Sequence, residues 1–150
     1  MERMEKMLTL SRLLDFSEVR RTVPLISASR WLVRDADVDC IRNNSGWVQR
    51  QSHRLLLFTD MLLITRRQRF ARCCFNLEIM YLIFFFSDET YLVADHCPRN
   101  LVQLSKFEDD EGESKSMAWI KLIRNHEDKM EEWLVSFRCG SYLTFLTYHS

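Results

Sequence analysis

Two short apolar runs lie close together near the middle of the chain. Residues 55–58 are Leu-Leu-Leu-Phe and residues 61–64 are Met-Leu-Leu-Ile, and only Thr59 and Asp60 separate them. Apolar runs joined by a two-residue polar break predict a β-hairpin with both strands largely buried. Asp60 tolerates the left-handed backbone of a tight turn, although no glycine follows it. We expect the rest of a sheet to form around this hairpin.

Other segments predict further strands on both sides of the hairpin. Within residues 31–41, the apolar residues Ala36, Val38 and Cys40 alternate with the acidic residues Asp35, Asp37 and Asp39. This period of two indicates a half-buried strand. A strong turn signal, Asn-Asn-Ser-Gly, follows at residues 43–46.

The second half of the chain predicts three more strand segments or pairs. We expect strands at residues 91–94, ended by residues 96–98, and at residues 101–107. A second hairpin is expected from residues 117–123 and 130–137, in which Trp133, Val135 and Phe137 share one face. About six or seven strands at short spacing predict an antiparallel β-barrel or β-sandwich.

The N-terminal residues predict a helix that needs a partner. In residues 1–16 the apolar side chains approximate a helical stripe, and residues 17–29 form a polar, irregular segment. A helix this short is marginal alone in water. We therefore expect it to dock on the sheet or on a part of a longer parent protein. The fold class is mainly β with a flanking helix.

Composition excludes several classes of function. The chain has 150 residues, which suit one domain, and its 21 basic and 21 acidic residues give no net charge. A nucleic-acid-binding protein usually carries a basic excess, so no nucleic acid partner is expected. Three glycines exclude a glycine-rich phosphate loop. The longest apolar run, residues 79–86, is shorter than the roughly 20 residues of a membrane-spanning helix, and no secretory signal is evident.

No catalytic or metal-binding motif is visible. The five cysteines lack a CxxC spacing and are expected to be reduced, and the four histidines are scattered in sequence. We therefore expect no enzyme activity, no cofactor and no metal site. The residues concerned are Cys40, Cys73, Cys74, Cys97 and Cys139, with His53, His96, His126 and His149.

Several stretches of this chain resemble the pleckstrin-homology domain of Dbl-family Rho guanine nucleotide exchange factors of the ephexin-like type. Residues 24–34, PLISASRWLVR, are similar to the segment that links the Dbl-homology helices to the first strand. Residues 53–66, HRLLLFTDMLLITR, look like the second and third strands. Residues 91–104 and 119–137 look like the remaining strands, and residues 1–16 resemble the end of the last Dbl-homology helix.

The resemblance implies a division of the chain. Residues 1–22 would be the terminal Dbl-homology helix and linker, and residues 23–137 a pleckstrin-homology-like domain with an insertion at 71–87. Residues 138–150 are an unassigned tail without a clear counterpart of the family's closing helix, so the barrel is expected to be incomplete at its C-terminus. The other helices that contact the GTPase are missing.

The resemblance also implies a function. The chain would be a non-catalytic fragment of an exchange factor that supports regulation of small GTPase signalling and membrane placement. Its implied partners are a Rho-family GTPase, through the parent protein, and anionic phospholipid, at a cytoplasmic, peripheral plasma-membrane location. Lipid-binding candidates are Arg34, Arg42, Arg50, His53 and Arg54, and a second basic patch holds Arg66, Arg67, Arg69 and Arg72.

Two observations and two competing hypotheses leave alternatives open. The three aspartates at 35, 37 and 39 lie close to the lipid-binding candidates and oppose an anionic headgroup. Trp47 follows a turn signal and would touch either a membrane interface or a partner. A stand-alone adaptor that binds phosphoinositide or protein, or an abortive isoform that does not fold stably, are the competing hypotheses.

Overall fold

The computed structural model describes residues 2–44, 46–68, 90–106 and 117–138. Helix α1 spans Glu2–Leu13 and is too short and too polar to traverse a lipid bilayer, as is every helix of the described residues. The strands are β1 (Leu14–Asp15), β2 (Leu32–Asn44), β3 (Trp47–Phe58), β4 (Met61–Gln68), β5 (Thr90–Pro98), β6 (Val102–Lys106), β7 (Met117–Leu122) and β8 (Glu131–Phe137), with a short 3-10 helix η2 (Arg99–Leu101).

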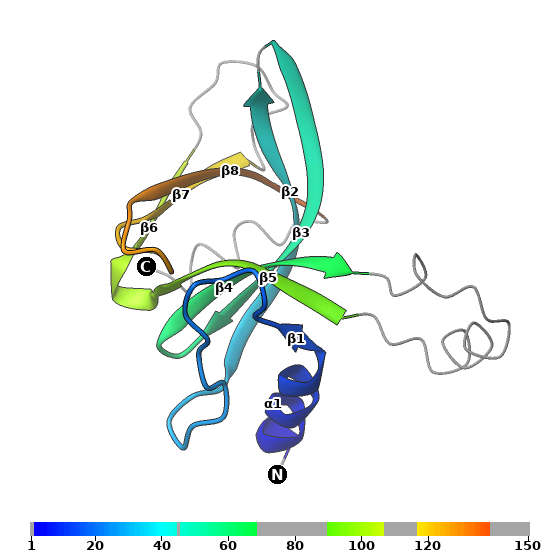
Figure 1. Ribbon diagram of the computed structural model, residues 1–150, viewed down its shortest axis with the longest axis vertical. Helices are drawn as coiled ribbons and strands as arrows, with labels where there is room; N and C mark the ends of the chain where they lie inside the picture. The colour runs from blue at the N-terminus through cyan, green and yellow to red at the C-terminus, as the bar shows by residue number, and fades with distance from the viewer. Residues whose placement is uncertain (1, 45, 69–89, 107–116, 139–150) are drawn as a thin grey trace, which may run out of the picture.

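The strands form one curved sheet of eight strands in the order β1-β5-β4-β3-β2-β8-β7-β6. β1 pairs with β5 in parallel, and every other pair is antiparallel. Figure 1 shows β6, β7 and β8 arching over β4 and β5, while α1 lies on the other side of that layer. The predicted mainly β fold with a flanking helix is confirmed.

Two apolar clusters explain why residues 55–58 of β3 and residues 61–64 of β4 are apolar at every position. Leu55 and Leu57 of β3 face an interior cluster shared with β2, β7 and β8. Leu56 and Phe58 face an outer cluster that holds Met7 of α1 and residues of the following linker. Both faces of these strands are covered, so their sequence does not alternate. The 55–58 and 61–64 hairpin is therefore confirmed.

The alternating strands are also found where the pattern predicted them. Ala36, Val38 and Cys40 of β2 are buried in the interior cluster, while the aspartates between them lie on the other face. Trp133, Val135 and Phe137 of β8 are buried on the same interior side. The turn after residue 44 contains Gly46, whose φ of 87° is a left-handed conformation that favours glycine.

One expected boundary was wrong. Residues 96–98 do not end the strand that begins near residue 91, because β5 continues through Pro98. The reason is its pairing with β4, in which His96 faces Leu63, Cys97 faces Leu62 and Pro98 faces Met61. A proline at the last position of a strand costs little, because it lacks only the amide hydrogen of a residue whose ladder ends there.

Several predictions fall on residues that the structure does not describe. These are the insertion at 71–87 and the tail beyond Arg138. Arg69, Arg72, Cys73, Cys74, Cys139 and His149 also lie outside the described residues.

Candidate functional site

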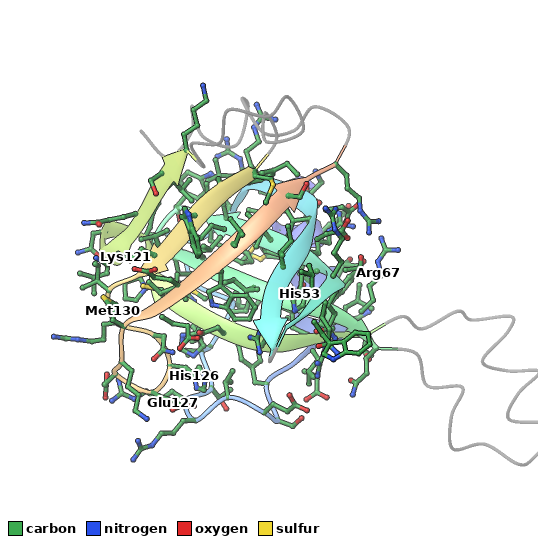
Figure 2. The ribbon with its side chains drawn as sticks, turned by 90° about the horizontal axis from the view of Figure 1, so that it is seen from above. His53, Arg67, Lys121, His126, Glu127 and Met130 are labelled. Atoms are coloured by element: carbon green, nitrogen blue, oxygen red, sulfur yellow. The ribbon has the colours of Figure 1, made fainter. Side chains whose placement is uncertain are left out.

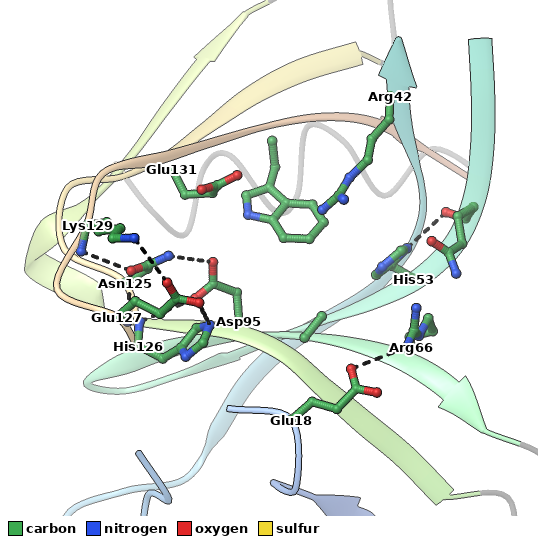
Figure 3. A pocket seen from close by; sticks show the side chains of 13 residues that line it. Glu18, Arg42, His53, Arg66, Asp95, Asn125, His126, Glu127, Lys129 and Glu131 are labelled. Atoms are coloured by element: carbon green, nitrogen blue, oxygen red, sulfur yellow. Dashed lines mark hydrogen bonds and ion pairs between the residues drawn. The ribbon is translucent and has the colours of Figure 1, made fainter. Parts of the chain in front are cut away.

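A cavity of about 380 Å³ opens at the end of the barrel where β2, β3 and β4 meet the loop between β7 and β8 (Figure 3). Its wall is built from segments that are far apart in the sequence. The lining residues are Glu18, Arg42, Gln51, His53, Arg66, Ala94, Asp95, Asn125, His126, Glu127, Lys129, Glu131 and Trp133.

The predicted lipid-binding residues divide between the two faces of the sheet. Arg42 and His53 line the cavity. Side chains of a strand alternate between faces, so Arg50 and Arg54 lie on the face opposite His53. Arg34 is at the other end of β2, where it is paired with Leu57 rather than with the residues near the hairpin tip. The structure therefore brings two of the five candidates together.

The positive charge of Arg54 is balanced by two acidic residues of the neighbouring strand β2, Asp35 and Asp37. Its guanidinium donates to the Asp35 carboxylate, lies 3.9 Å from Asp37 and stands 5.7 Å above the Tyr91 ring. Burial alone would lower the pKa of Arg54, but the hydrogen bond and charge of Asp35 outweigh it and raise that pKa. Arg54 therefore stays charged, and its charge is already matched on the same face of the sheet.

His53 contributes a neutral ring to the cavity. Its Nδ1 lies 3.0 Å from the Gln51 carbonyl oxygen, and the ring meets Trp133 edge-on at 5.7 Å. Burial lowers the pKa of His53 below its ordinary value of 6.5. At neutral pH this histidine adds no positive charge for an anionic ligand.

The cavity as a whole is not basic. Carboxylates from Glu18, Asp95, Glu127 and Glu131 outnumber the lining arginines and lysine. Arg66 is 3.5 Å from Glu18 and Lys129 is 3.5 Å from Glu127, while Arg42 lies 4.8 Å above the Trp133 ring. A headgroup with several phosphates would meet these carboxylates at close range, which is unfavourable.

The second predicted basic patch is described only in part. Arg66 belongs to the cavity and Arg67 lies near the end of β4, at the outer edge of the sheet, whereas His53 lies inside its curve (Figure 2). The other two arginines of this patch are outside the described residues.

Sequence reasoning missed the polar group at the base of the cavity. The buried Asp95 carboxylate accepts from the backbone N–H of His96 at 2.8 Å, from Asn125 Nδ2 at 3.2 Å and from the backbone N–H of His126 at 3.4 Å. The Asn125 side-chain oxygen in turn accepts from the N–H groups of Glu127 and Lys129, which fixes the loop. The available signal was an aspartate that interrupts the apolar residues of β5.

One polar atom of the cavity has no partner among the described residues. Trp133 is buried, and its Nε1 makes no hydrogen bond there. In the same described part of the chain, no three His, Cys, Asp or Glu side chains are arranged to hold a metal ion. The cavity therefore offers a hydrogen-bond donor in a wall of mixed charge.

The tip of the β2–β3 hairpin carries a different kind of surface. Figure 1 shows this hairpin extending past the rest of the sheet. Trp47 and Val48, the first residues of β3, are 78% and 66% exposed. Arg50 follows them on β3, and residues 41–52 contain no acidic residue. The Arg42 guanidinium, in contrast, lies over the Trp133 ring at the cavity. The tip is therefore apolar and basic, in contrast to the cavity.

Comparisons with known proteins identify relatives of this chain in sequence. No protein-family model matches the chain. The chain is 32% identical over 149 residues to Rho guanine nucleotide exchange factor 16 of Homo sapiens, which covers 91% of this chain and 18% of that protein. It is 23% identical over 172 residues to Ephexin-1 of Rattus norvegicus, which covers 100% of this chain and 21% of that protein.

A solved structure shows the same fold. The DH/PH domains of PDZ-RhoGEF, in complex with RhoA activated by GTP-gamma-S, align with a TM-score of 0.67 and 13% identity, over 99% of this chain and 38% of that one. The chain thus spans about a fifth of the length of the two related proteins and is similar to the part of an exchange factor that includes the pleckstrin-homology domain. The eight-stranded sheet, the flanking helix and the sequence identity together support a pleckstrin-homology domain of the kind found in Dbl-family Rho guanine nucleotide exchange factors.

Proposed function

We propose that the chain is a non-catalytic pleckstrin-homology module that regulates the exchange activity of a parent protein and places that protein at a membrane. Residues 1–22 are assigned to the end of the Dbl-homology domain and its linker, and residues 23–137 to the pleckstrin-homology domain. The partner of the parent is a Rho-family GTPase. The complex of PDZ-RhoGEF with RhoA supports this assignment by analogy.

The exposed face of α1 is the observation that carries the regulatory part of the proposal. Met7 is buried in the outer cluster, so the helix is held on the sheet. Met4 and Leu8, one turn apart, are 49% and 44% exposed. Met4 also lines a hollow of about 240 Å³ between the helix and residues 26–31. An apolar helix face left uncovered fits a helix that continues into a larger helical domain.

The isolated chain is expected to leave the rate of GDP release from RhoA unchanged. Release requires a surface that binds the nucleotide-free GTPase better than the loaded one. Within the described residues, α1 is the one α-helix, and it has 12 residues. The measurement is the loss of a fluorescent GDP analogue from RhoA with the chain in molar excess. Release by EDTA serves as the positive control, and a tenfold acceleration by the chain would refute the non-catalytic assignment.

Membrane placement is assigned to the hairpin tip. Tryptophan is favoured at membrane interfaces, because its ring is apolar and its N–H finds a partner in the headgroup region. Each arginine near an anionic leaflet adds about 1 kcal/mol of attraction. The cavity is a poorer site for an anionic headgroup because its carboxylates outnumber its permanent cations. We therefore expect affinity for anionic bilayers with little preference among headgroups, at the cytoplasmic face of the plasma membrane.

The Trp47→Ala substitution is expected to weaken binding to phosphatidylserine vesicles by about tenfold, since burying such a side chain is worth at least about 1.4 kcal/mol. Co-sedimentation with vesicles that contain phosphatidylserine, phosphatidylcholine alone, or added phosphoinositide measures the effect. Leu8→Ala is the matched control, because α1 lies at the far end of the molecule from the tip (Figure 1). Equal losses in both variants, or binding that requires phosphoinositide, would contradict the assignment to the tip.

A further inference from the structure

The linker between β1 and β2 is tied to the barrel by two buried histidines. The backbone N–H of Arg20 donates to Nδ1 of His126 at 3.0 Å, and Nε2 of His96 lies 2.9 Å from the Arg21 carbonyl oxygen. The two rings are 5.9 Å apart. Because His126 belongs to the loop between β7 and β8 and His96 to β5, these contacts join three segments that are distant in sequence.

The two histidines play opposite chemical roles in these contacts. Nδ1 of His126 accepts a hydrogen bond, so it must carry no proton. The His96 nitrogen faces a carbonyl oxygen, so it donates and must carry a proton. Protonation of His126 therefore turns its acceptor into a second donor that faces the Arg20 N–H. Protonation of His96 at its other nitrogen leaves its contact with Arg21 intact.

Charged groups surround His126 on every side. From β5, the Asp95 carboxylate lies 3.9 Å from its Nε2, and the His96 ring packs beside it. From its own loop, the Glu127 carboxylate lies 3.6 Å from Nε2. From the linker, the Arg21 guanidinium is paired with Asp128, the second residue after His126. Glu18, Arg66 and Lys129 complete the wall of the cavity that His126 lines.

These surroundings support two arrangements of the ring. The neutral ring accepts from the Arg20 amide at Nδ1, whereas a charged ring would present N–H groups to both the Arg20 amide and the two carboxylates near Nε2. Histidine is the side chain that ordinarily changes its charge near neutral pH. We propose that His126 is a pH-sensitive latch, whose neutral ring holds the linker against the barrel and whose protonation releases residues 18–20 from the β7–β8 loop, while Arg21 stays paired with Asp128.

Release has a structural consequence for the cavity. Glu18 lies at the start of the latched segment and is paired with Arg66 at 3.5 Å. A released linker withdraws this carboxylate from the cavity wall, and Arg66 loses its acidic neighbour. Acidification thus makes the cavity less acidic and loosens the connection between α1 and β2. The latch follows from the described contacts alone and stands or falls independently of the proposed function.

The contact between His96 and the Arg21 carbonyl oxygen is kept when His126 is protonated. Burial lowers the pKa of His96 below its ordinary value of 6.5, and the positive charge that His126 acquires lowers it further. In either charge state Nε2 of His96 carries a proton, so it continues to donate to the Arg21 carbonyl oxygen.

Hydrogen exchange of the full chain tests the latch at about pH 7.5 and about pH 5.5, on either side of the range in which histidine changes its charge. After correction for the intrinsic exchange rate, the protection of the amides of residues 18–20 is expected to fall about tenfold at the lower pH, relative to the amides of β4. The same fall is expected in His53→Gln, which removes a buried histidine that does not touch the linker. His126→Gln is expected to show no fall, because its amide oxygen accepts the Arg20 N–H without titrating.

Two outcomes would overturn the latch. One is a wild-type linker with the same protection at both pH values, and the other is a tenfold fall that persists in His126→Gln. If His126→Gln does not fold, NMR titration of the wild-type chain decides, because the Arg20 amide resonance must follow the titration of the His126 ring. An Arg20 resonance that follows His96 or does not move would also refute the proposal.

Discussion

Replacing Phe58 with alanine is expected to lower the free energy of unfolding by about 3–5 kcal/mol. Phe58 ends β3 and is fully buried in the outer cluster, together with Met7 of α1 and Leu25 of the linker. Removing the ring takes away its transfer free energy and leaves a cavity that these neighbours can fill only in part. Urea unfolding followed by tryptophan fluorescence measures the change.

The Phe58→Ala variant also tests whether α1 depends on the outer cluster more strongly than the interior strands do. Hydrogen exchange is expected to show that α1 loses protection in Phe58→Ala before the interior strands do, because the helix depends on this layer for its stability. Val48→Ala is the control, since Val48 is an exposed residue of the same strand and its loss should change stability by less than about 0.5 kcal/mol. A loss of less than about 1 kcal/mol in Phe58→Ala would mean that the helix and linker do not pack on the sheet as described.

The strands that could be predicted are those in which the local order of apolar and polar residues reflects which faces of the strand are buried. β3 and β4 were predicted because both faces are covered, which makes residues 55–58 and 61–64 continuously apolar. β2 and β8 were predicted because one face is buried and the other is polar. In these cases the local pattern and the tertiary environment agree.

Elements that depend on distant partners could not be predicted in the same way. Residues 49–52 are polar, yet they extend β3 because each pairs with a residue of β2. β1 has two residues and exists through its parallel pairing with β5. The continuation of β5 through Pro98 similarly requires β4 beside it. Backbone pairing with a neighbouring strand leaves little trace in the sequence of either strand.

The arrangement of the candidate site also depends on contacts between distant segments that the sequence does not reveal. The five predicted lipid-binding residues are close in sequence, but strand alternation sends Arg42 and His53 to one face and Arg54 to the other. The carboxylates that offset the cavity cations come from Glu18 and Glu127, which no local pattern connects to β2 or β4. Charge counted along the chain therefore overstated the basic character of this surface.

The Asp95→Asn substitution is expected to lower the free energy of unfolding by about 2–3 kcal/mol. The Asp95 carboxylate is buried and accepts three N–H groups, two of which belong to Asn125 and His126. An asparagine of the same shape keeps one acceptor oxygen and turns its amide toward donors that are cut off from water. The loss is therefore that of a charge-assisted bond together with an unsatisfied buried donor. Urea unfolding measures it.

Asp128→Asn is the matched control for this prediction, because it makes the same chemical change at a carboxylate of the β7–β8 loop, which Asp95 contacts from β5. The Asp128 carboxylate is exposed and paired with Arg21, and an exposed ion pair is worth about 0–1 kcal/mol. If the network at Asp95 fixes the β7–β8 loop, Asp95→Asn should also reduce the protection of residues 18–20 at neutral pH, because His126 would no longer be held in position to accept the Arg20 N–H. Equal stability losses in the two variants would mean that the Asp95 network does not organise the loop, since the buried Asp95 carboxylate accepts three N–H groups and the exposed Asp128 carboxylate forms one ion pair.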